Sequence, residues 1–368
     1  MSLVPRHVLM TTDAVGGVWT YALDLAEGLS ARGVRITLAV SGPAPRPAQR
    51  RAAEQIEGLT LVDAGGTLDW LADGPRPLDQ TARALRGLAG QNGVDLVHLN
   101  SPALRGDEDW GAPVVGVCHS CVATWWDAVR GTALPEDFVW RTERLAQGYR
   151  RCDRLIAPSF AFMQTTAARY GVLPATVRNG RRPIGTRPVP RRRQVLTSGR
   201  LWDEGKNIAT LERAARRMRG RVEAAGPLEG PNGQSVHLDR IQPLGALGPT
   251  DLQQRLRLAS IFCAPSLYEP FGLGVLEAAQ AGCALVLADI PTFRELWEGA
   301  ALFVSPQDDA ALAVVLDELL EDADRARRLG RLAAERAEQF SLEAMVEGTL
   351  AVYAEALAQR VPFGEAAA

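Results

Sequence analysis

Residues 264–277 read Ala-Pro-Ser-Leu-Tyr-Glu-Pro-Phe-Gly-Leu-Gly-Val-Leu-Glu, and this stretch lies between a predicted strand and a predicted helix. In open parallel sheets, ligands bind at the carboxyl ends of the strands. Gly272 and Gly274 let the backbone approach a ligand and leave N–H groups at the start of a helix. Glu269 and Glu277 flank this turn, and a carboxylate accepts hydrogen bonds well from neighbouring ribose or hexose hydroxyls. Charge complementing a helix dipole explains one of these glutamates, but not both.

A second stretch with the same strand-to-helix position precedes it. Residues 196–207 read Leu-Thr-Ser-Gly-Arg-Leu-Trp-Asp-Glu-Gly-Lys-Asn. Arg200 and Lys206 could neutralise a diphosphate at a helix N-terminus. Lysine and arginine total 41, and Lys206 is the single lysine, so the other 40 are arginines. A general preference for arginine explains why lysine is scarce, but not why the remaining lysine lies in this loop. The alternative, a solvated pair of cations beside acidic neighbours, is therefore less favoured.

The first half of the chain contributes two weaker signals. Residues 13–21 read Asp-Ala-Val-Gly-Gly-Val-Trp-Thr-Tyr, again between a strand and a helix. Gly16 and Gly17 alone also fit a tight turn, because the dinucleotide fingerprint needs a third glycine and a downstream acid. His119 ends a predicted strand, where a site residue and a structural histidine are equally plausible. The other three histidines are interpreted as structural.

Short apolar runs alternate with helical patterns in both halves, which predicts two α/β domains with parallel sheets. The predicted strands of the first half are Val8–Thr12, Ile36–Val40, Leu59–Asp63, Leu96–Asn100, Val114–His119 and Leu155–Pro158. Those of the second half are Val195–Ser198, Val222–Ala225, Ile261–Pro265, Leu285–Asp289 and Leu302–Ser305. The proline- and arginine-rich segment between the halves has a linker composition. We therefore predict domains over 1–180 and 195–340, a linker over 181–194 whose arginines are mostly solvated, and a C-terminal helical segment over 341–368.

Composition excludes several classes of protein. The formal net charge of −2 gives no indication of nucleic-acid binding. No apolar run reaches the ~18 residues of a membrane-spanning helix, and no signal peptide is recognised, so we expect a cytoplasmic protein. Five cysteines suit free thiols, and Cys118 and Cys121 lack the second ligand pair of a zinc finger. Asp107-Glu108-Asp109 has the form of a metal–nucleotide clamp, but its polar context predicts a solvated loop. No metal site is expected.

Taken together, these motifs resemble the retaining family 4 glycosyltransferases of the GT-B fold. Glu269 to Glu277 matches that family's Glu-x7-Glu signature, and Gly199-Arg200-Leu201 with Lys206 resembles its diphosphate motif. Asp13–Tyr21, the strand ending at His119, and Phe340-Ser341-Leu342-Glu343-Ala344-Met345 resemble other family segments in the right order. The resemblance implies an α/β fold of two Rossmann-like domains facing across a cleft. It also implies a C-terminal helix that crosses back to the N-terminal domain.

The resemblance also implies roles for individual residues. Arg200 and Lys206 would bind the diphosphate and stabilise the departing nucleotide, and Glu277 would hold the ribose. Glu269 and the amides of Phe271, Gly272 and Leu273 would hold the donor sugar. His119 would contact the sugar at the reaction centre, and Gly16 and Gly17 would line the site near the acceptor or phosphate.

The sequence therefore predicts a retaining, metal-independent glycosyltransferase without a cofactor, whose donor is a UDP-, GDP- or ADP-sugar. The acceptor, a sugar, a lipid or another small molecule, is not identified. A minority interpretation of the linker arginines is peripheral contact with anionic lipid on the inner face of the membrane. The alternatives are a nucleotide-sugar epimerase, a pyridoxal-phosphate phosphorylase using Lys206, and a non-catalytic nucleotide-sugar-binding subunit.

Overall fold

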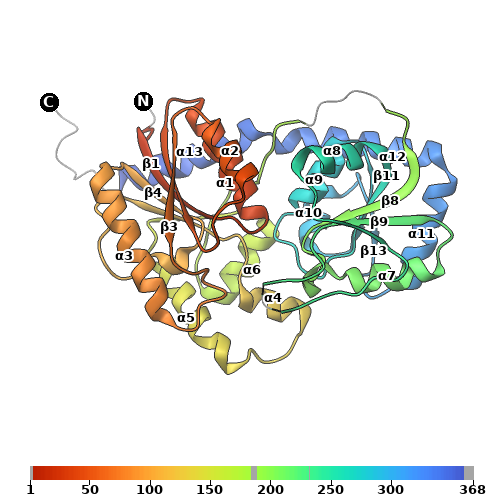
Figure 1. Ribbon diagram of the computed structural model, residues 1–368, viewed down its shortest axis with the longest axis horizontal. Coiled ribbons are helices and arrows are strands. Elements are labelled where there is room, and N and C mark those ends of the chain that lie inside the picture. The colour runs from red at the N-terminus through yellow and green to blue at the C-terminus, as the bar shows by residue number, and fades with distance from the viewer. Residues whose placement is uncertain (1–2, 184–188, 232, 360–368) are drawn as a thin grey trace. The chain divides into compact units, whose positions relative to one another are not determined.

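The computed structural model describes residues 3–183, 189–231 and 233–359, and these fall into two compact units. The first unit comprises Met1–Asp127, Thr132–Gly180 and Leu342–Ala368; the second comprises Ala128–Gly131 and Arg181–Ser341. Each unit contains one parallel sheet flanked by helices (Figure 1). The prediction of two Rossmann-like α/β halves is confirmed.

The first unit is built on a seven-stranded sheet in the order β3-β2-β1-β4-β5-β6-β7, with every pairing parallel. All six strands predicted here are present, and β7 was not predicted. The bounds are β1 (His7–Asp13), β2 (Arg35–Ser41), β3 (Leu59–Gly65), β4 (Leu96–Leu99), β5 (Val114–Val117), β6 (Arg154–Ala157) and β7 (Ala175–Thr176). The central strands β4 and β5 are buried along their whole length, and β1 is buried up to its last residue, Asp13, as their apolar sequences indicate.

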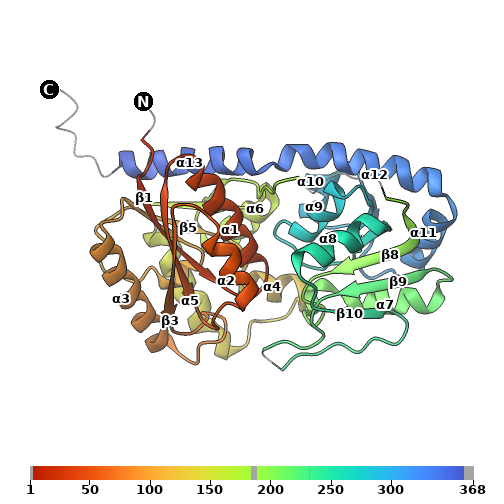
Figure 2. The same cartoon turned by 45° about the horizontal axis from the view of Figure 1, so that its top comes forward.

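The helices of the first unit are α1 (Gly17–Ser30), α2 (Pro47–Glu54), α3 (Pro75–Asn92), α4 (Val122–Val129), α5 (Glu136–Arg151), α6 (Phe160–Tyr170) and α13 (Leu342–Ala358). The C-terminal helix α13 packs against α1 in this unit (Figure 2), so the prediction that the last helix returns to the first domain is confirmed. Gly28 permits the close approach, because a Cβ there would lie 2.4 Å from Val346 Cγ2.

The second unit repeats this architecture with a six-stranded parallel sheet in the order β10-β9-β8-β11-β12-β13. Its strands are β8 (Arg192–Ser198), β9 (Arg221–Ala225), β10 (Gln242–Gly245), β11 (Ala259–Ala264), β12 (Ala284–Ala288) and β13 (Leu302–Val304). Its helices are α7 (Ile208–Arg217), α8 (Pro249–Leu258), α9 (Leu273–Gln280), α10 (Pro291–Trp297), α11 (Asp309–Glu321) and α12 (Ala323–Ala337). In both sheets the chain order reverses beside the first strand, and such a switch point is where doubly wound sheets bind ligands.

The linker arginines differ from the sequence prediction. Strand β8 begins at Arg192, inside the predicted linker, and Arg191 donates to the carbonyl oxygens of Ala259 and Ala281. Arg193 Nε donates to Leu320 O at 2.7 Å. The prediction of a solvated side chain is therefore wrong for Arg191, whose guanidinium group satisfies carbonyls at the ends of other elements, whereas Arg193 is exposed although its Nε bonds one such carbonyl. Within the predicted linker, residues 184–188 lie outside the described residues, as do residues 360–368 of the predicted C-terminal segment.

The remaining sequence signals lie away from the switch points. Asp107, Glu108 and Asp109 are exposed, and the first two pair with Arg151 and Arg86. All five cysteines have free thiols. Within the described ranges, no helix is both long and apolar enough to span a bilayer.

Candidate active site

The loop after β8 places Arg200 and Lys206 at the switch point of the second sheet. Gly199 has a φ of 143°, and its N–H donates to Ala225 O at 3.0 Å. Arg200 Nη2 then pairs with Asp203 Oδ2 at 2.9 Å. The other oxygen of Asp203 accepts from Gly205 N at 2.9 Å and caps a short 3-10 turn, Glu204–Lys206. Asp203 therefore orients the arginine and shapes the turn that presents the lysine.

Asn207 holds this loop against the neighbouring strand end. It has a φ of 54°, and among the described residues it is the only non-glycine with positive φ. Asparagine tolerates the left-handed region better than most residues. Its Nδ2 donates to Pro265 O at 2.9 Å and to Pro306 O at 2.8 Å, while Gly205 O accepts from the amides of Leu267 and Tyr268. These bonds join the two motif-bearing loops that the sequence identified separately.

The consequence is a direct contact between the two motifs. Lys206 Nζ lies 2.5 Å from Glu269 Oε2, and the two side chains are only 21% and 15% exposed. An ammonium and a carboxylate at this distance form a charge-assisted hydrogen bond. The two residues are 63 positions apart in the sequence, and the sequence analysis did not predict that they pair.

Helix α9 begins at Leu273, four residues after Glu269, and its start supplies backbone amides. Gly272 is its N-cap with a φ of 94°, a conformation that favours glycine. Phe271 is buried against the ring of Phe340, with centroids 5.7 Å apart. The first amides of a helix have no intrahelical acceptor, so the segment from Phe271 to Leu273 presents donors at a positive dipole end.

Glu277 lies one turn further along α9 and pairs with Arg181. The two side chains are 17% and 20% exposed. Arg181 is held by its backbone as well: its N–H donates to Phe340 O at 3.1 Å, and its carbonyl accepts from Gln280 Nε2 at 3.3 Å. The sequence analysis assigned Arg181 to a solvated linker, and this prediction is wrong because the side chain reaches the carboxylate of α9.

The first unit places its candidate residues at the carboxyl ends of β1, β4 and β5. Gly16, with a φ of 93°, is the N-cap of α1, and both Gly16 and Gly17 are exposed. Asp13 Oδ1 accepts from Val15 N at 2.6 Å and holds this turn. Tyr21, one turn into α1, packs its ring at 4.6 Å and 76° to the ring of His119.

His119 follows β5, and its Nε2 lies 2.7 Å from Asn100 Oδ1. Burial lowers the pKa of His119 to about 3, with a smaller contribution from His98. The imidazole is therefore neutral at physiological pH. Three residues of this environment, Tyr21, His98 and Asn100, were not predicted as site residues. The sequence feature that could have identified them is their position, at the end of a strand or at the start of a helix.

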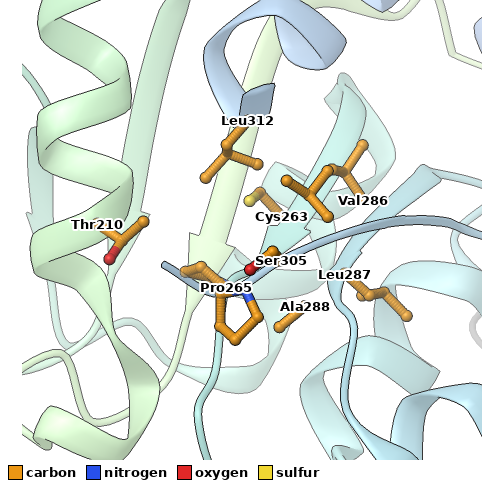
Figure 3. A pocket seen from close by; sticks show the side chains of 10 residues that line it. Thr210, Cys263, Pro265, Val286, Leu287, Ala288, Ser305 and Leu312 are labelled. Atoms are coloured by element: carbon orange, nitrogen blue, oxygen red, sulfur yellow. The ribbon is translucent and has the colours of Figure 1, made fainter. Parts of the chain in front are cut away.

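A small pocket of about 10 Å³ lies elsewhere in the second unit, among α7, α11 and the ends of β11 to β13 (Figure 3). Its walls include Thr210, Cys263, Val286 and Leu312, and none of the predicted site residues lines it. This volume is below the range of most ligand sites. We interpret it as a packing gap beside the Asn207 contacts. Throughout residues 3–183, 189–231 and 233–359, no group of three or more histidine, cysteine or acidic side chains is arranged to hold a metal ion.

Comparison with protein families matches both halves of the chain. The model described as Glycosyltransferase Family 4 matches residues 15–181, and the model described as Glycosyl transferases group 1 matches residues 192–322. The matches therefore include Gly16, Gly17 and His119 in the first half, and both motif-bearing loops in the second.

Named relatives align over most of their length. An MMP alpha-(1->4)-mannosyltransferase from Mycolicibacterium hassiacum is 27% identical, covering 86% of this chain and 82% of its own. A D-inositol 3-phosphate glycosyltransferase from Streptomyces scabiei is 28% identical, covering 96% and 89%.

Solved structures share the fold. Sucrose-phosphate synthase from Thermosynechococcus elongatus superposes with a TM-score of 0.75 at 19% identity, covering 96% of this chain and all of that one. HepE from Anabaena in complex with UDP-glucose gives 0.72 at 18% identity, covering 94% and 98%. The GT-B architecture expected from the sequence is confirmed by these neighbours.

Proposed function

Because this chain belongs to the family 4 glycosyltransferases, we propose that it transfers a sugar from its nucleotide donor with retention of anomeric configuration and without a metal ion. The chain is a nucleotide-sugar glycosyltransferase, and this assignment excludes the epimerase, the phosphorylase and the non-catalytic binding subunit. We further propose that it needs no cofactor other than the donor.

The observation that carries the proposal is the contact between Lys206 and Glu269 beside the start of α9. Breaking the bond from the anomeric carbon to the phosphate oxygen leaves negative charge on the diphosphate. Lys206, Arg200 and the amides of Phe271 to Leu273 provide two cations and a helix N-terminus at one switch point. Fixed charges of this kind stabilise a leaving group without reorganisation, which is the role that a metal ion would otherwise fill.

The roles of the other residues are proposed from the motifs that they share with the family. Glu277 would accept from the ribose hydroxyls, and Glu269 from the donor sugar. His119 would contact the sugar from the first unit, and Gly16 and Gly17 would leave room for the acceptor or the phosphate. A hydroxyl of the acceptor attacks the anomeric carbon on the face that the diphosphate leaves, and its proton passes to the leaving phosphate oxygen. Attack on that face gives retention.

The donor is proposed to be a UDP-, GDP- or ADP-sugar and the acceptor a hydroxyl-rich sugar, lipid or other small molecule. The UDP-glucose in HepE supports the donor class, and the names of the mannosyl- and inositol-phosphate-directed relatives support the acceptor class. The linker arginines that satisfy internal carbonyls weaken the case for contact with anionic lipid, so we do not propose membrane binding.

The test begins with thermal shift against a panel of nucleotide sugars, followed by turnover of the best ligand with candidate acceptors. A ligand at 100 times its Kd adds about 2.7 kcal/mol of stability. Proton NMR of the product reads the anomeric configuration, and turnover is repeated with EDTA. Inversion would contradict retention, and loss of turnover in EDTA with recovery in manganese would contradict metal independence.

A further inference from the structure

A continuous chain of polar side chains connects the C-terminal helix to His119 inside the first unit. Tyr353 Oη on α13 lies 2.8 Å from His98 Nδ1, and His98 Nε2 lies 3.3 Å from Asn100 Oδ1. His119 Nε2 lies 2.7 Å from the same Asn100 oxygen. Tyr353 and His98 are fully buried, and Asn100 is 8% exposed. Two histidine rings therefore share one acceptor.

The backbone of β1 determines the orientation of the Asn100 amide. Asn100 Nδ2 donates to Thr11 O at 2.6 Å, and Asn100 N donates to Thr11 Oγ1 at 2.9 Å. A backbone carbonyl can only accept, so the nitrogen of the amide must face Thr11 and the oxygen must face the histidines. The reverse orientation would place two acceptors 2.6 Å apart.

The amide orientation then determines the tautomer of both histidines. An amide oxygen only accepts, so Nε2 must carry the proton in His98 and in His119. His98 Nδ1 is left with a lone pair, and the Tyr353 hydroxyl donates to it. Burial lowers the pKa of His98 to about 4 and that of His119 to about 3, so neither ring carries a second proton near neutral pH.

We propose that Asn100 is the positioning residue of His119, fixing it as the Nε2–H tautomer so that its Nδ1 lone pair remains available as an acceptor for a substrate hydroxyl. The inference rests on the proposed role of His119 at the reaction centre. Within the described part of the chain, no hydrogen bond to His119 Nδ1 is found. The edge contact with Tyr21 restricts the ring plane, and Asn100 supplies the polarity.

The first experiment reads the tautomers directly. Long-range proton–nitrogen correlation spectra of the full-length, ligand-free protein with nitrogen-15 histidine distinguish a protonated ring nitrogen from one with a lone pair. At pH 7 we expect His98 and His119 each to show a protonated Nε2 and an unprotonated Nδ1. An Nδ1–H tautomer, or a doubly protonated ring at His119, would overturn the proposal.

The second experiment changes the acceptor while keeping the shape of the side chain, and it also replaces the nitrogen that donates to Thr11 O with an oxygen. Asn100→Asp places a carboxylate between the two histidines, which favours their protonation, so His119 Nδ1 should gain a proton at neutral pH. Asn92→Asp, on the exposed end of α3 beside His7, makes the same chemical change away from His98 and His119 and should leave the signals of these two rings unaltered. Unchanged His119 signals in a folded Asn100→Asp protein would also overturn the proposal.

Tyr353→Phe tests whether Asn100 determines the tautomer of His119 independently of the hydrogen bond between Tyr353 and His98. It removes only the donor to His98 Nδ1, so we expect the His98 signals to move while His119 keeps its tautomer. A change of tautomer at His119 in this variant would show that Asn100 does not determine it.

Turnover provides the functional readout. In Asn100→Asp, kcat should fall about tenfold or more while the KM for the donor changes less than about threefold, because the altered atom acts at the reaction centre. An unchanged kcat with an altered His119 spectrum would reject the positioning role. Failure of the proposed function is distinguishable, because it would appear as no turnover in the unmodified protein with the expected imidazole spectrum intact.

Discussion

At the scale of single residues, three ion pairs join the charged side chains around the second unit's switch point: Lys206 with Glu269, Arg200 with Asp203, and Arg181 with Glu277. A nucleotide sugar must exchange contacts with these pairs in order to bind. Its affinity therefore depends on the difference between the new and the old interactions. Each residue can be tested through the pair to which it belongs.

Replacement of Lys206 tests the diphosphate assignment. Lys206→Ala removes a charge-assisted hydrogen bond worth about 1.5–3 kcal/mol, so kcat/KM should fall roughly tenfold to a hundredfold or more. Lys206→Arg should also lose activity, because a planar fork does not replace a point charge at a side chain that is only 21% exposed. Steady-state kinetics with the identified donor measure both, with the exposed Arg219→Ala as a control. Wild-type kcat/KM in Lys206→Ala would remove Lys206 from the site.

Replacement of Arg181 tests whether it competes with the ribose for Glu277. In Arg181→Gln the carboxylate is released from its cation, and the Kd of the nucleoside diphosphate should fall about threefold to tenfold. Glu277→Gln should weaken binding, because an amide accepts hydroxyl hydrogen bonds less strongly than a carboxylate. Isothermal titration calorimetry measures both variants. Equal or weaker binding by Arg181→Gln would show that Arg181 supports Glu277 rather than competing for it.

The site residues differ in how far the sequence could predict them. Glu269 and Glu277 were predictable from spacing, and Lys206 from its singularity among forty arginines. Arg181 was not, because its proline- and arginine-rich surroundings are typical of a solvated linker and its partner is 96 residues away. Tyr353 was not predictable either, since an apolar C-terminal helix gives no indication that one hydroxyl meets a histidine 255 residues earlier.

At the scale of elements, the ends of β8 and β9 approach each other so closely that glycine is required. A Cβ on Gly226, which has a φ of 147°, would lie 1.8 Å from Gly199 O. Gly199 directly precedes Arg200, so the same contact fixes the start of the loop that carries Arg200 and Lys206. The order of these strands was predictable from alternating patterns, but this approach was not. The edge strand β10 was missed because its sequence, Gln-Pro-Leu-Gly, has no apolar run and is mostly exposed.

Gly226→Ala tests the importance of that approach. We expect it to destabilise the second unit by about 3 kcal/mol or more, because both the strained φ and the backbone clash oppose the new methyl group. Gly299→Ala is the matched control: its φ is 79° but nothing lies within 4 Å, so only a backbone cost of about 1 kcal/mol is expected. Hydrogen exchange of second-unit peptides measures both. Equal losses of stability in the two variants would contradict the requirement for glycine.

At the scale of the whole molecule, the two units repeat one strand order, and each carries its candidate residues at its own switch point. This repetition made the fold predictable from strand and helix rhythm, although the halves share no evident sequence repeat. The side chains at the two switch points differ in charge. The second unit presents paired charges, whereas the first presents neutral histidines in a buried polar chain. The difference predicts that the units respond differently to acid.

Three of the four histidines lie in the first unit, where His7 and His98 are buried and His119 is partly buried, while His237 in the second unit is exposed. Burial lowers the pKa of all three, to about 4 for His98 and about 3 for His119. Because these folded-state values lie below the unfolded value of about 6.5, unfolding takes up protons in acid. The stability contributed by the neutral rings is therefore fully present above pH 6.5 and is lost as the pH falls toward 4 and 3.

When the pH falls from 6.5 to 5, His98 and His119 should each lower the free energy of unfolding of the first unit by about 2 kcal/mol. One pKa unit of difference between the folded and unfolded states corresponds to about 1.36 kcal/mol. Asp69 has the opposite effect on stability, because burial raises its pKa. Asp289 and Asp309 affect stability only at lower pH, because neighbouring arginines lower their pKa values. Hydrogen exchange at both pH values, corrected for intrinsic rates, should show protection falling for β4 and β5 and holding for β11 and β12. His119→Gln should remove about half of that loss. A uniform loss across both sheets would contradict the assignment of acid sensitivity to the histidines of the first unit.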